Sequence, residues 1–251
     1  MVSKKVTKLF AGLLVVVMTC GLVGCGFTKK PDVGGTIKNE QKEEEKTNIE
    51  DSKTEVEEKE DEKDVVEKEE TVDLSMGKAE GNVYESEFLG VGFKLPEGWT
   101  FYTAEQIKEL NGLTTDMLDE DIAETIKNAS IVYDMMALDN AGNSTNVNIE
   151  KVNAAQAAII TEEKYAEIAI PSLKNALSSM GFSSVTAEAS TTKFAGEDAV
   201  CIDITCSNGT VTMYEKVVCK KIGTYMAAIT VASAQTDTTE DILGQFYKLE
   251  K

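Results

Sequence analysis

The sequence contains no histidine, and all 25 of its basic residues are lysine, so arginine is absent as well. The absence of histidine removes the most common general base near neutral pH, and with it Ser-His-Asp catalysis, Cys-His catalysis and histidine-based zinc sites. Without arginine, the chain has no planar guanidinium to hold a carboxylate or phosphate through two parallel hydrogen bonds. These absences favour a binding protein over an enzyme, and we expect no catalytic residue, no cofactor and no metal site.

Positive charge is also scarce. The 44 acidic residues outnumber the 25 lysines and leave a formal net charge of −19. Nucleic-acid binding depends on cationic groups that neutralise phosphates. We therefore expect no nucleic-acid partner.

The first residues have the layout of an export signal. An apolar run over residues 9–18 follows a basic start made of three lysines, Lys4, Lys5 and Lys8. The run is shorter than the roughly 20 residues that a membrane-spanning helix needs. We therefore treat this segment as a targeting sequence that is removed from the mature protein, and we exclude it from the fold.

The segment ends in Leu22-Val23-Gly24-Cys25, with an aliphatic residue at −3 and a small residue at −1 before the cysteine. This run resembles the lipobox of bacterial lipoproteins. In that family the cysteine thiol receives a diacylglycerol, and a dedicated peptidase cuts immediately before it. The resemblance implies a signal peptide at 1–24, cleavage between Gly24 and Cys25, and lipidation of Cys25. Cys20 competes for this role, but it follows a threonine, which suits the −1 position poorly.

A lipidated Cys25 would anchor the mature protein to the extracytoplasmic face of the cell membrane. Each buried CH₂ of an acyl chain contributes about 0.8 kcal/mol, and two or more chains give a stable anchor. The expected partner of the N-terminus is therefore the membrane, reached through palmitate-type chains. An uncleaved membrane helix is the alternative, and the short apolar run argues against it.

Residues 25–80 form an acidic, lysine- and glutamate-rich stretch. Within it, residues 38–73 hold 17 acidic residues and 7 lysines, a net charge of −10. The few apolar residues do not keep a heptad, so a coiled coil is not supported. We predict a disordered, self-repelling tether that holds the following domain away from the membrane.

From residue 81 onward the charges thin out and apolar periodicity begins, which predicts an α+β domain over 81–251. Alternating and buried-strand patterns predict strands at 83–88, 91–95, 131–138, 146–152, 185–194, 199–206, 210–220 and 225–232. Helical spacing predicts helices that begin after Thr103 in a capping-box pattern and after Asp116, and further helices at about 161–180 and 238–249. The strand at 225–232 is nearly all apolar, so we expect it at the centre of the sheet.

Two of the predicted helices carry specific expectations. The helix at 161–180 has an expected buried stripe of Tyr165, Ile168, Ala169, Ala176, Leu177 and Met180. Pro171 should kink or split this helix, and Gly181 should end it. The helix at 238–249 is expected to bury Ile242, Leu243, Phe246 and Leu249.

The strand that opens the domain ends in the pattern F-x-L-P-x-G-W, from Phe93 to Trp99. This pattern is similar to the opening of Mog1/PsbP-like α/β/α domains, found in photosystem II extrinsic proteins and many small bacterial lipoproteins. The predicted order of elements is similar too, over about 82–251. The resemblance implies an antiparallel sheet flanked by helices in an α/β/α sandwich, and a non-enzymatic role in binding or assembly.

Several candidate sites have both a functional and a structural interpretation. Trp99 can line a binding groove, although packing of a helix against the sheet edge is the simpler interpretation. Ser75 and Lys78 match an S-x-x-K nucleophile pattern but have no partner motif. An acidic group at a predicted helix start suits the helix dipole better than a cation, and it comprises Asp116, Asp119, Glu120, Asp121 and Glu124. Three thiols remain after the anchor, and we expect Cys201, Cys206 and Cys219 to be core residues, with any disulfide left open.

These observations support three hypotheses about function. The first is a surface lipoprotein whose non-enzymatic domain binds another protein of the envelope. The second is an accessory lipoprotein that holds a solute or cation. The third, and the least supported, is an envelope hydrolase that uses carboxylates or a Ser-Lys pair.

Overall fold

The computed structural model describes residues 73–112 and 131–250 of the chain. The predicted signal peptide, Cys25, the predicted tether up to residue 72 and the helix expected after Asp116 lie outside these described residues. Where the chain is described, every strand pair is antiparallel and a few helices accompany the sheets. The α+β class predicted from the sequence is therefore confirmed.

The described strands form a seven-stranded sheet and a four-stranded sheet. The large sheet has the order β4 (Thr100–Phe101), β5 (Ile131–Leu138), β6 (Ser144–Lys151), β10 (Tyr225–Ala234), β9 (Thr212–Ile222), β8 (Glu197–Ser207), β7 (Ser184–Phe194). The small sheet has the order β1 (Lys78–Glu80), β2 (Val83–Ser86), β3 (Val91–Lys94), β11 (Phe246–Lys248). Strand β10 is the middle strand of the large sheet, and nine of its ten residues are buried, as its apolar sequence predicted.

Four helices appear among the described residues. They are α2 (Ala104–Leu110), α4 (Ala154–Ala157), α5 (Glu162–Ser179) and α6 (Thr239–Leu243). The predicted capping box at α2 is confirmed, because Gln106 and Thr103 each bond to the backbone amide of the other. At α5, the Thr161 side chain accepts a bond from the amide of Lys164. These polar caps fix where each helix begins.

Helix α5 differs from its prediction in two respects. It continues through Pro171 without splitting. Its buried residues are Ala166, Leu173 and Leu177, whereas Ile168 is 39% exposed, so its predicted burial was wrong. Ile168 lies five residues before Leu173, which turns it about 140° away from the buried stripe.

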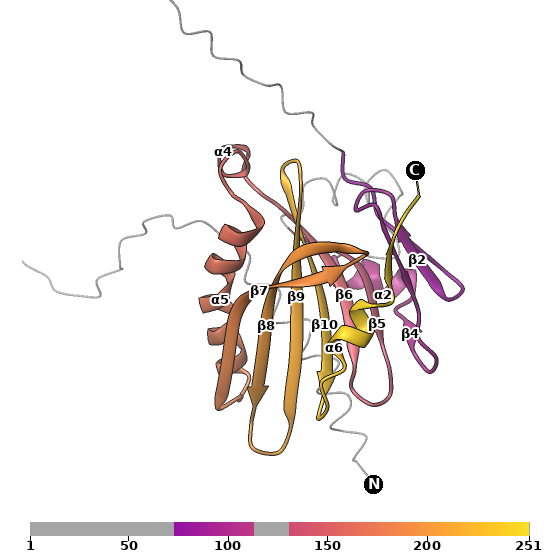
Figure 1. Ribbon diagram of the computed structural model, residues 1–251. Coiled ribbons are helices and arrows are strands. Elements are labelled where there is room, and N and C mark those ends of the chain that lie inside the picture. Colours follow the sequence, from indigo (N-terminus) through magenta and orange to yellow (C-terminus); the bar gives the residue numbers. More distant parts are fainter. Residues whose placement is uncertain (1–72, 113–130, 251) are drawn as a thin grey trace, which may run out of the picture. The chain divides into compact units, whose positions relative to one another are not determined.

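The two faces of the large sheet are covered differently. Helix α5 packs on β7, β8 and β9, and its buried side chains join an apolar cluster with one face of the sheet. The small sheet and α6 contribute to a second cluster with the opposite face. Figure 1 shows α5 beside β7 and β8, with β2 of the small sheet at the other end of the large sheet. No helix in the described ranges is long and apolar enough to span a membrane.

The end of the chain corrects the predicted helix at 238–249. Helix α6 stops at Leu243, and Phe246–Lys248 form strand β11 on the edge of β3. Phe246 is buried as expected, but through strand pairing with Phe93 instead of helical spacing. A single short turn gains little from helix formation alone. Pairing with β3 supplies partners for the amides and carbonyls of an otherwise open sheet edge.

Polar contacts also join the two sheets. The buried Asp134 of β5 accepts hydrogen bonds from the Tyr84 hydroxyl at 2.6 Å and from the Gly77 amide at 2.7 Å. Burial raises the pKa of Asp134, and these two bonds oppose that rise. Helix α6 is tied to the large sheet by Lys216, whose amine lies 2.6 Å from Asp203 and 3.1 Å from Glu240.

The position of β11 predicts unequal effects for two adjacent substitutions. Phe246→Ala should lower the free energy of unfolding by about 3–5 kcal/mol, because it removes a buried ring that contacts both sheets. Tyr247→Ala, on the opposite side of the strand, should cost less than about 1 kcal/mol. Urea denaturation followed by circular dichroism measures both. Equal costs would contradict the strand assignment.

Candidate functional site

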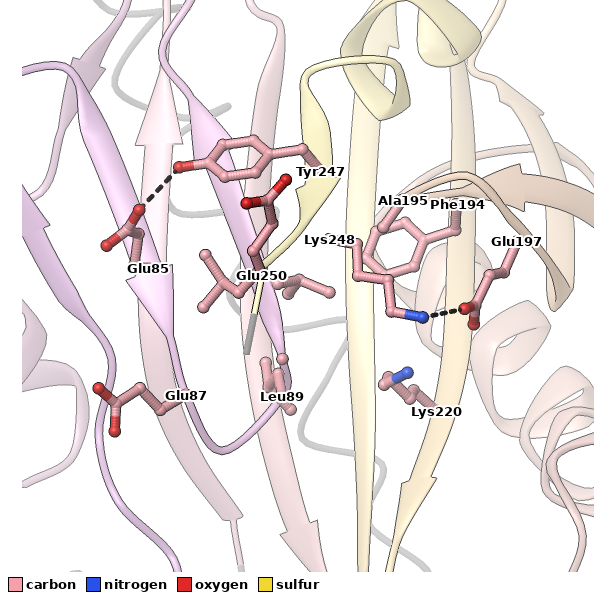
Figure 2. A pocket seen from close by; sticks show the side chains of 13 residues that line it. Glu85, Glu87, Leu89, Phe194, Ala195, Glu197, Lys220, Tyr247, Lys248 and Glu250 are labelled. Carbon is pink, nitrogen blue, oxygen red and sulfur yellow. Dashed lines mark hydrogen bonds and ion pairs between the residues drawn. The ribbon is translucent and has the colours of Figure 1, made fainter.

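A groove of about 1580 Å³ lies beside β11 (Figure 2). Its lining comes from β2 and the loop that leads into β3, from β11 and the residues after it, from the β7–β8 hairpin, and from the end of β9. Its apolar part includes three buried side chains, Leu89, Val91 and Phe194. Its charged lining residues are four glutamates and two lysines, a net charge of −2, namely Glu85, Glu87, Glu197, Glu250, Lys220 and Lys248.

Two tight turns shape the walls of this groove. The loop between β2 and β3 closes at Gly90, whose φ of 68° lies in the left-handed region and whose amide bonds to the Ser86 carbonyl. The β7–β8 hairpin turns at Ala195 and Gly196, both with positive φ. A non-glycine residue at positive φ is uncommon, and Ala195 itself lines the groove. The hairpin is thus held against the groove in a constrained conformation.

Tyr247 lies across the outer face of the small sheet. Its hydroxyl donates a hydrogen bond to Glu85 at 3.0 Å, two strands away, and it passes over Gly92 on the strand between them. A Cβ at Gly92 would overlap the Tyr247 ring, so glycine is required there for this arrangement. Partial burial and the neighbouring Glu85 raise the pKa of Tyr247. The ring remains 36% exposed and available to a ligand.

Lys248 extends to the other side of β11 and pairs with Glu197 at 2.6 Å (Figure 2). The bond to Lys248 and its charge lower the pKa of Glu197. Both side chains are more than half exposed, so this pair contributes little to stability. The two ends of the pair belong to different sheets, and the pair therefore crosses from β11 to the wall of the groove.

The backbone of β11 is paired on one side only. The amide of Lys94 bonds to the Gln245 carbonyl, and the amide of Leu249 bonds to the Gly90 carbonyl. The backbone polar groups of every second residue, Gln245, Tyr247 and Leu249, therefore point toward β3. The same alternation turns the amides and carbonyls of Phe246 and Lys248 away from β3. Since β11 is the last strand of its sheet, these groups form an open sheet edge.

The residues singled out from the sequence lie elsewhere. Trp99 is partly buried against the cluster between the sheets and does not line this groove. Ser75 precedes edge strand β1 instead of a helix, and Lys78 is the first residue of that strand. In the turn after β5, the Asp139 carboxylate acts locally, because its Oδ1 accepts bonds from the amides of Ala141, Gly142 and Asn143. No cluster of potential metal ligands occurs among the described residues.

The three remaining cysteines are buried and free. They lie on β8 and β9, within the large sheet. Burial raises the pKa of Cys201, Cys206 and Cys219 to about 12 in each case, so the thiols are protonated near neutral pH. The thiolate is the nucleophilic form of cysteine, so these side chains are poorly suited to covalent chemistry.

A second unusual feature is a buried polar row on β6. Ser144, Asn146 and Asn148 lie on one face of this strand, and one polar atom of each is buried without a hydrogen-bond partner. Each such atom costs about 1–3 kcal/mol. On the same face, Glu215 of β9 is separated from Ser144 by Ala232 of β10. The alternating sequence of β6 would predict a solvated polar face, and the fold buries it instead.

Sequence reasoning missed the residues that define the groove at β11. Tyr247 and Lys248 lay within a predicted helix. The opposite directions that their side chains take on a strand could not be anticipated from that prediction. The open edge depends on which strand β3 pairs with, and this pairing spans about 150 residues of sequence. The only local signal was Gly244, which directly follows the last helical residue.

Comparison with known proteins gives little further information. No family model matches the sequence, and no curated protein matches it. Among solved structures, the fold is similar in part to the crystal structure of PA94 from Pseudomonas aeruginosa, a protein of unknown function described as a putative regulator. The likeness covers 40% of this chain and 62% of that chain, at 13% identity and a TM-score of 0.22. The chain thus spans less than two thirds of that protein, and a likeness at this level carries no argument about function.

Glu215 predicts a measurable pH dependence of stability. Burial raises its pKa from 4.5 to about 7. Between these values the folded state binds more protons than the unfolded state, so this group makes stability fall as pH rises. Glu215→Gln should therefore be more stable than the parent at about pH 8, by roughly 3 kcal/mol at most, and equal to it near pH 4.

Urea denaturation at several pH values tests this expectation. Glu188→Gln, at an exposed position on β7 two strands away from β9, is the matched control and should leave the parent profile unchanged. Parallel profiles for the parent and Glu215→Gln would show that the carboxyl is not held in its neutral form.

Proposed function

We propose that this chain is a lipoprotein anchored through Cys25 to the extracytoplasmic face of the cell membrane, and that its domain binds another protein of the envelope without catalysis. The groove beside β11 is the observation that carries the binding role. At about 1580 Å³ it exceeds the roughly 300–1,000 Å³ typical of small-molecule pockets, which favours a segment of a macromolecule as its occupant.

The Mog1/PsbP-like assignment is part of the same proposal. The F-x-L-P-x-G-W pattern and the order of elements along the chain support it. The large antiparallel sheet, with α5 on one face and α6 on the other, is compatible with the helix-flanked sheet of that family. The four-stranded sheet beside α6 is an additional layer that the sequence did not predict.

The polar row of β6 supports a second candidate function, the binding of a polar solute. Unpaired amide and hydroxyl groups on Ser144, Asn146 and Asn148 could bond to a hydroxyl- or amide-rich molecule. Such a ligand would stabilise the native state by an amount that rises with the logarithm of one plus its concentration divided by its dissociation constant. Strong thermal stabilisation by a neutral sugar or amino acid would favour this candidate over protein binding.

The anchor has a direct test. Cys25→Ala should abolish metabolic labelling with a radioactive fatty acid and leave an uncleaved precursor, because the thiol that accepts the diacylglycerol is gone. Cys20→Ala is the matched control and should be labelled and processed normally. Persistent labelling of the Cys25→Ala protein would refute the proposed anchor.

Photo-cross-linking in intact cells tests the binding role. A photoreactive benzophenone side chain is introduced into the full-length protein, at Glu87 in the groove and at the exposed positions Ala158 and Ser178 far from it. We expect one discrete adduct from position 87, since a bound segment would contact the groove. The absence of an adduct from all three positions would overturn the proposed protein partner.

A further inference from the structure

We infer that the domain docks on the outer surface of the cell membrane through the short helix α4, with the side chain of Ile159 inserted among the lipid headgroups. Residues 154–159, which comprise α4 and the two residues after it, form the contact and are called the α4 tip below. This inference rests on the proposed anchor at Cys25 and adds an orientation of the domain relative to the membrane.

The α4 tip presents apolar side chains to solvent. Ile159 is 80% exposed, the highest fraction among the exposed large apolar residues of the described chain. Three alanines of the tip are exposed as well, Ala154, Ala155 and Ala158. No residue from 152 to 161 carries a charge. Insertion of the tip into a headgroup layer would therefore bury apolar surface without taking a charge of the tip out of water.

The fold holds the tip in this exposed position. Ala157 and Ile160 are buried in the cluster that α5 forms with the large sheet. The Lys221 amine donates a hydrogen bond to the Ala157 carbonyl at 2.6 Å, and the Asn153 side chain caps the start of α4. Since the residues around it are fixed in this way, Ile159 is directed outward by tertiary packing.

The described chain begins at the same end of the domain as the α4 tip. Burial and the nearby charge of Asp73 raise the pKa of Tyr225, which directly follows the β9–β10 turn. In that turn, the Thr224 carbonyl accepts a bond from the amide of Val152, just before the tip. Figure 1 shows α4 and the purple start of the described chain at one end of the domain. The chain that leads back to Cys25 therefore joins the domain at the end that carries the tip.

The predicted tether makes a weak contact sufficient. A flexible chain of roughly 50 residues has an end-to-end distance on the order of 40 Å. A domain anchored through such a chain stays close to the membrane, at an effective concentration that is millimolar for short flexible linkers. The lipid supplies most of the membrane affinity, and the tip needs only to orient the domain.

The size and charge of the tip favour a membrane over a protein surface. A specific protein interface buries about 1,000 Å² or more, which one isoleucine and three alanines cannot provide. The same limit argues against a second copy of this chain as the occupant. The segment 151–164 holds two lysines and two glutamates, so its charges balance. Anionic lipids therefore meet less repulsion at this segment than the net charge of the whole chain, −19, would produce.

Nitroxide labelling of the full-length chain tests this orientation. Membrane fragments are isolated from cells that express the protein with a single added cysteine. Ala155→Cys places the label one helical turn before Ile159, and Ser178→Cys places it at the exposed far end of α5. Electron paramagnetic resonance compares collisions of the label with oxygen, which is enriched in lipid, and with a nickel chelate, which stays in water. The oxygen-to-nickel ratio should be at least several-fold higher at position 155 than at position 178.

The native thiols of the described chain should not take up the label. Burial raises the pKa of Cys201, Cys206 and Cys219 to about 12, so these thiols stay protonated. The parent chain without an added cysteine measures any background.

Substitutions at the tip test the role of the side chain. Ile159→Asp introduces a charge that is costly in lipid, and it should lower the ratio at position 155 to the value at position 178. Ile168→Asp is the matched control, because it places the same charge at another exposed isoleucine, on α5, and it should leave the ratio unchanged. Ile159→Trp should keep or raise the ratio, since tryptophan suits the membrane interface. Circular dichroism checks that each variant keeps the parent fold.

The remaining outcomes separate the anchor from the docking. Recovery of the parent chain apart from membranes would refute the anchor, and the docking with it. A membrane-bound chain with equally low ratios at both labels would overturn the docking and leave the anchor in place. High ratios at both labels would mean that α5 lies along the membrane, which would overturn docking through the tip alone.

Two further results would contradict apolar insertion. The first is a high ratio at position 155 that Ile159→Asp does not change. The second is a ratio that falls in about 1 M sodium chloride, where the Debye length is only about 3 Å, because a contact of that kind would be electrostatic.

Discussion

The packing of Phe246 against two other phenylalanines determines the geometry of the candidate site. Its ring centroid lies 4.6 Å from that of Phe93 in the small sheet and 5.1 Å from that of Phe194 at the end of β7. These contacts hold β11, the edge strand of the small sheet, against the end of β7 in the large sheet. Because strand residues alternate in direction, burial of Phe246 turns Tyr247 outward and leaves Lys248 beside the wall of the groove. The groove, its charged rim and the open edge of β11 all follow from this placement.

The large sheet combines a very apolar strand with a polar neighbour. Strand β10 is buried almost throughout, whereas the adjacent β6 places Ser144, Asn146 and Asn148 on one buried face without full hydrogen bonding. Apolar residues at these three positions would leave no polar side-chain atom unpaired, as is the case for Val147 and Ile149 on the opposite face of β6. The domain therefore tolerates a local free-energy cost of unpaired buried polar atoms near its centre. These atoms are the reason that a polar solute is the second candidate ligand, beside a protein partner.

Local patterns predicted much of the fold because their signals lie within a few residues of one another. The strands β5 and β7–β10, the capping box at Thr103 and the end of α5 at Gly181 all rest on such short-range chemistry. The errors arose where two local patterns coincide. Phe246 is buried in both a helix and a strand interpretation, and the burial of Ile168 depended on which stripe of α5 faces the sheet. Only contacts with distant strands separate these alternatives.

By itself, the sequence determined that the chain has no histidine or arginine, that residues 38–73 are strongly acidic, and that an α+β domain follows with β10 at its centre. The lipobox-like run Leu22–Cys25 stays a prediction. Tertiary structure alone decided the site. The groove joins residues near position 90, near 195 and near 248, and the edge of β11 is defined by its pairing with β3. Pairing between strands so far apart is selected by burial of shared apolar faces across the whole domain, and no local pattern encodes it.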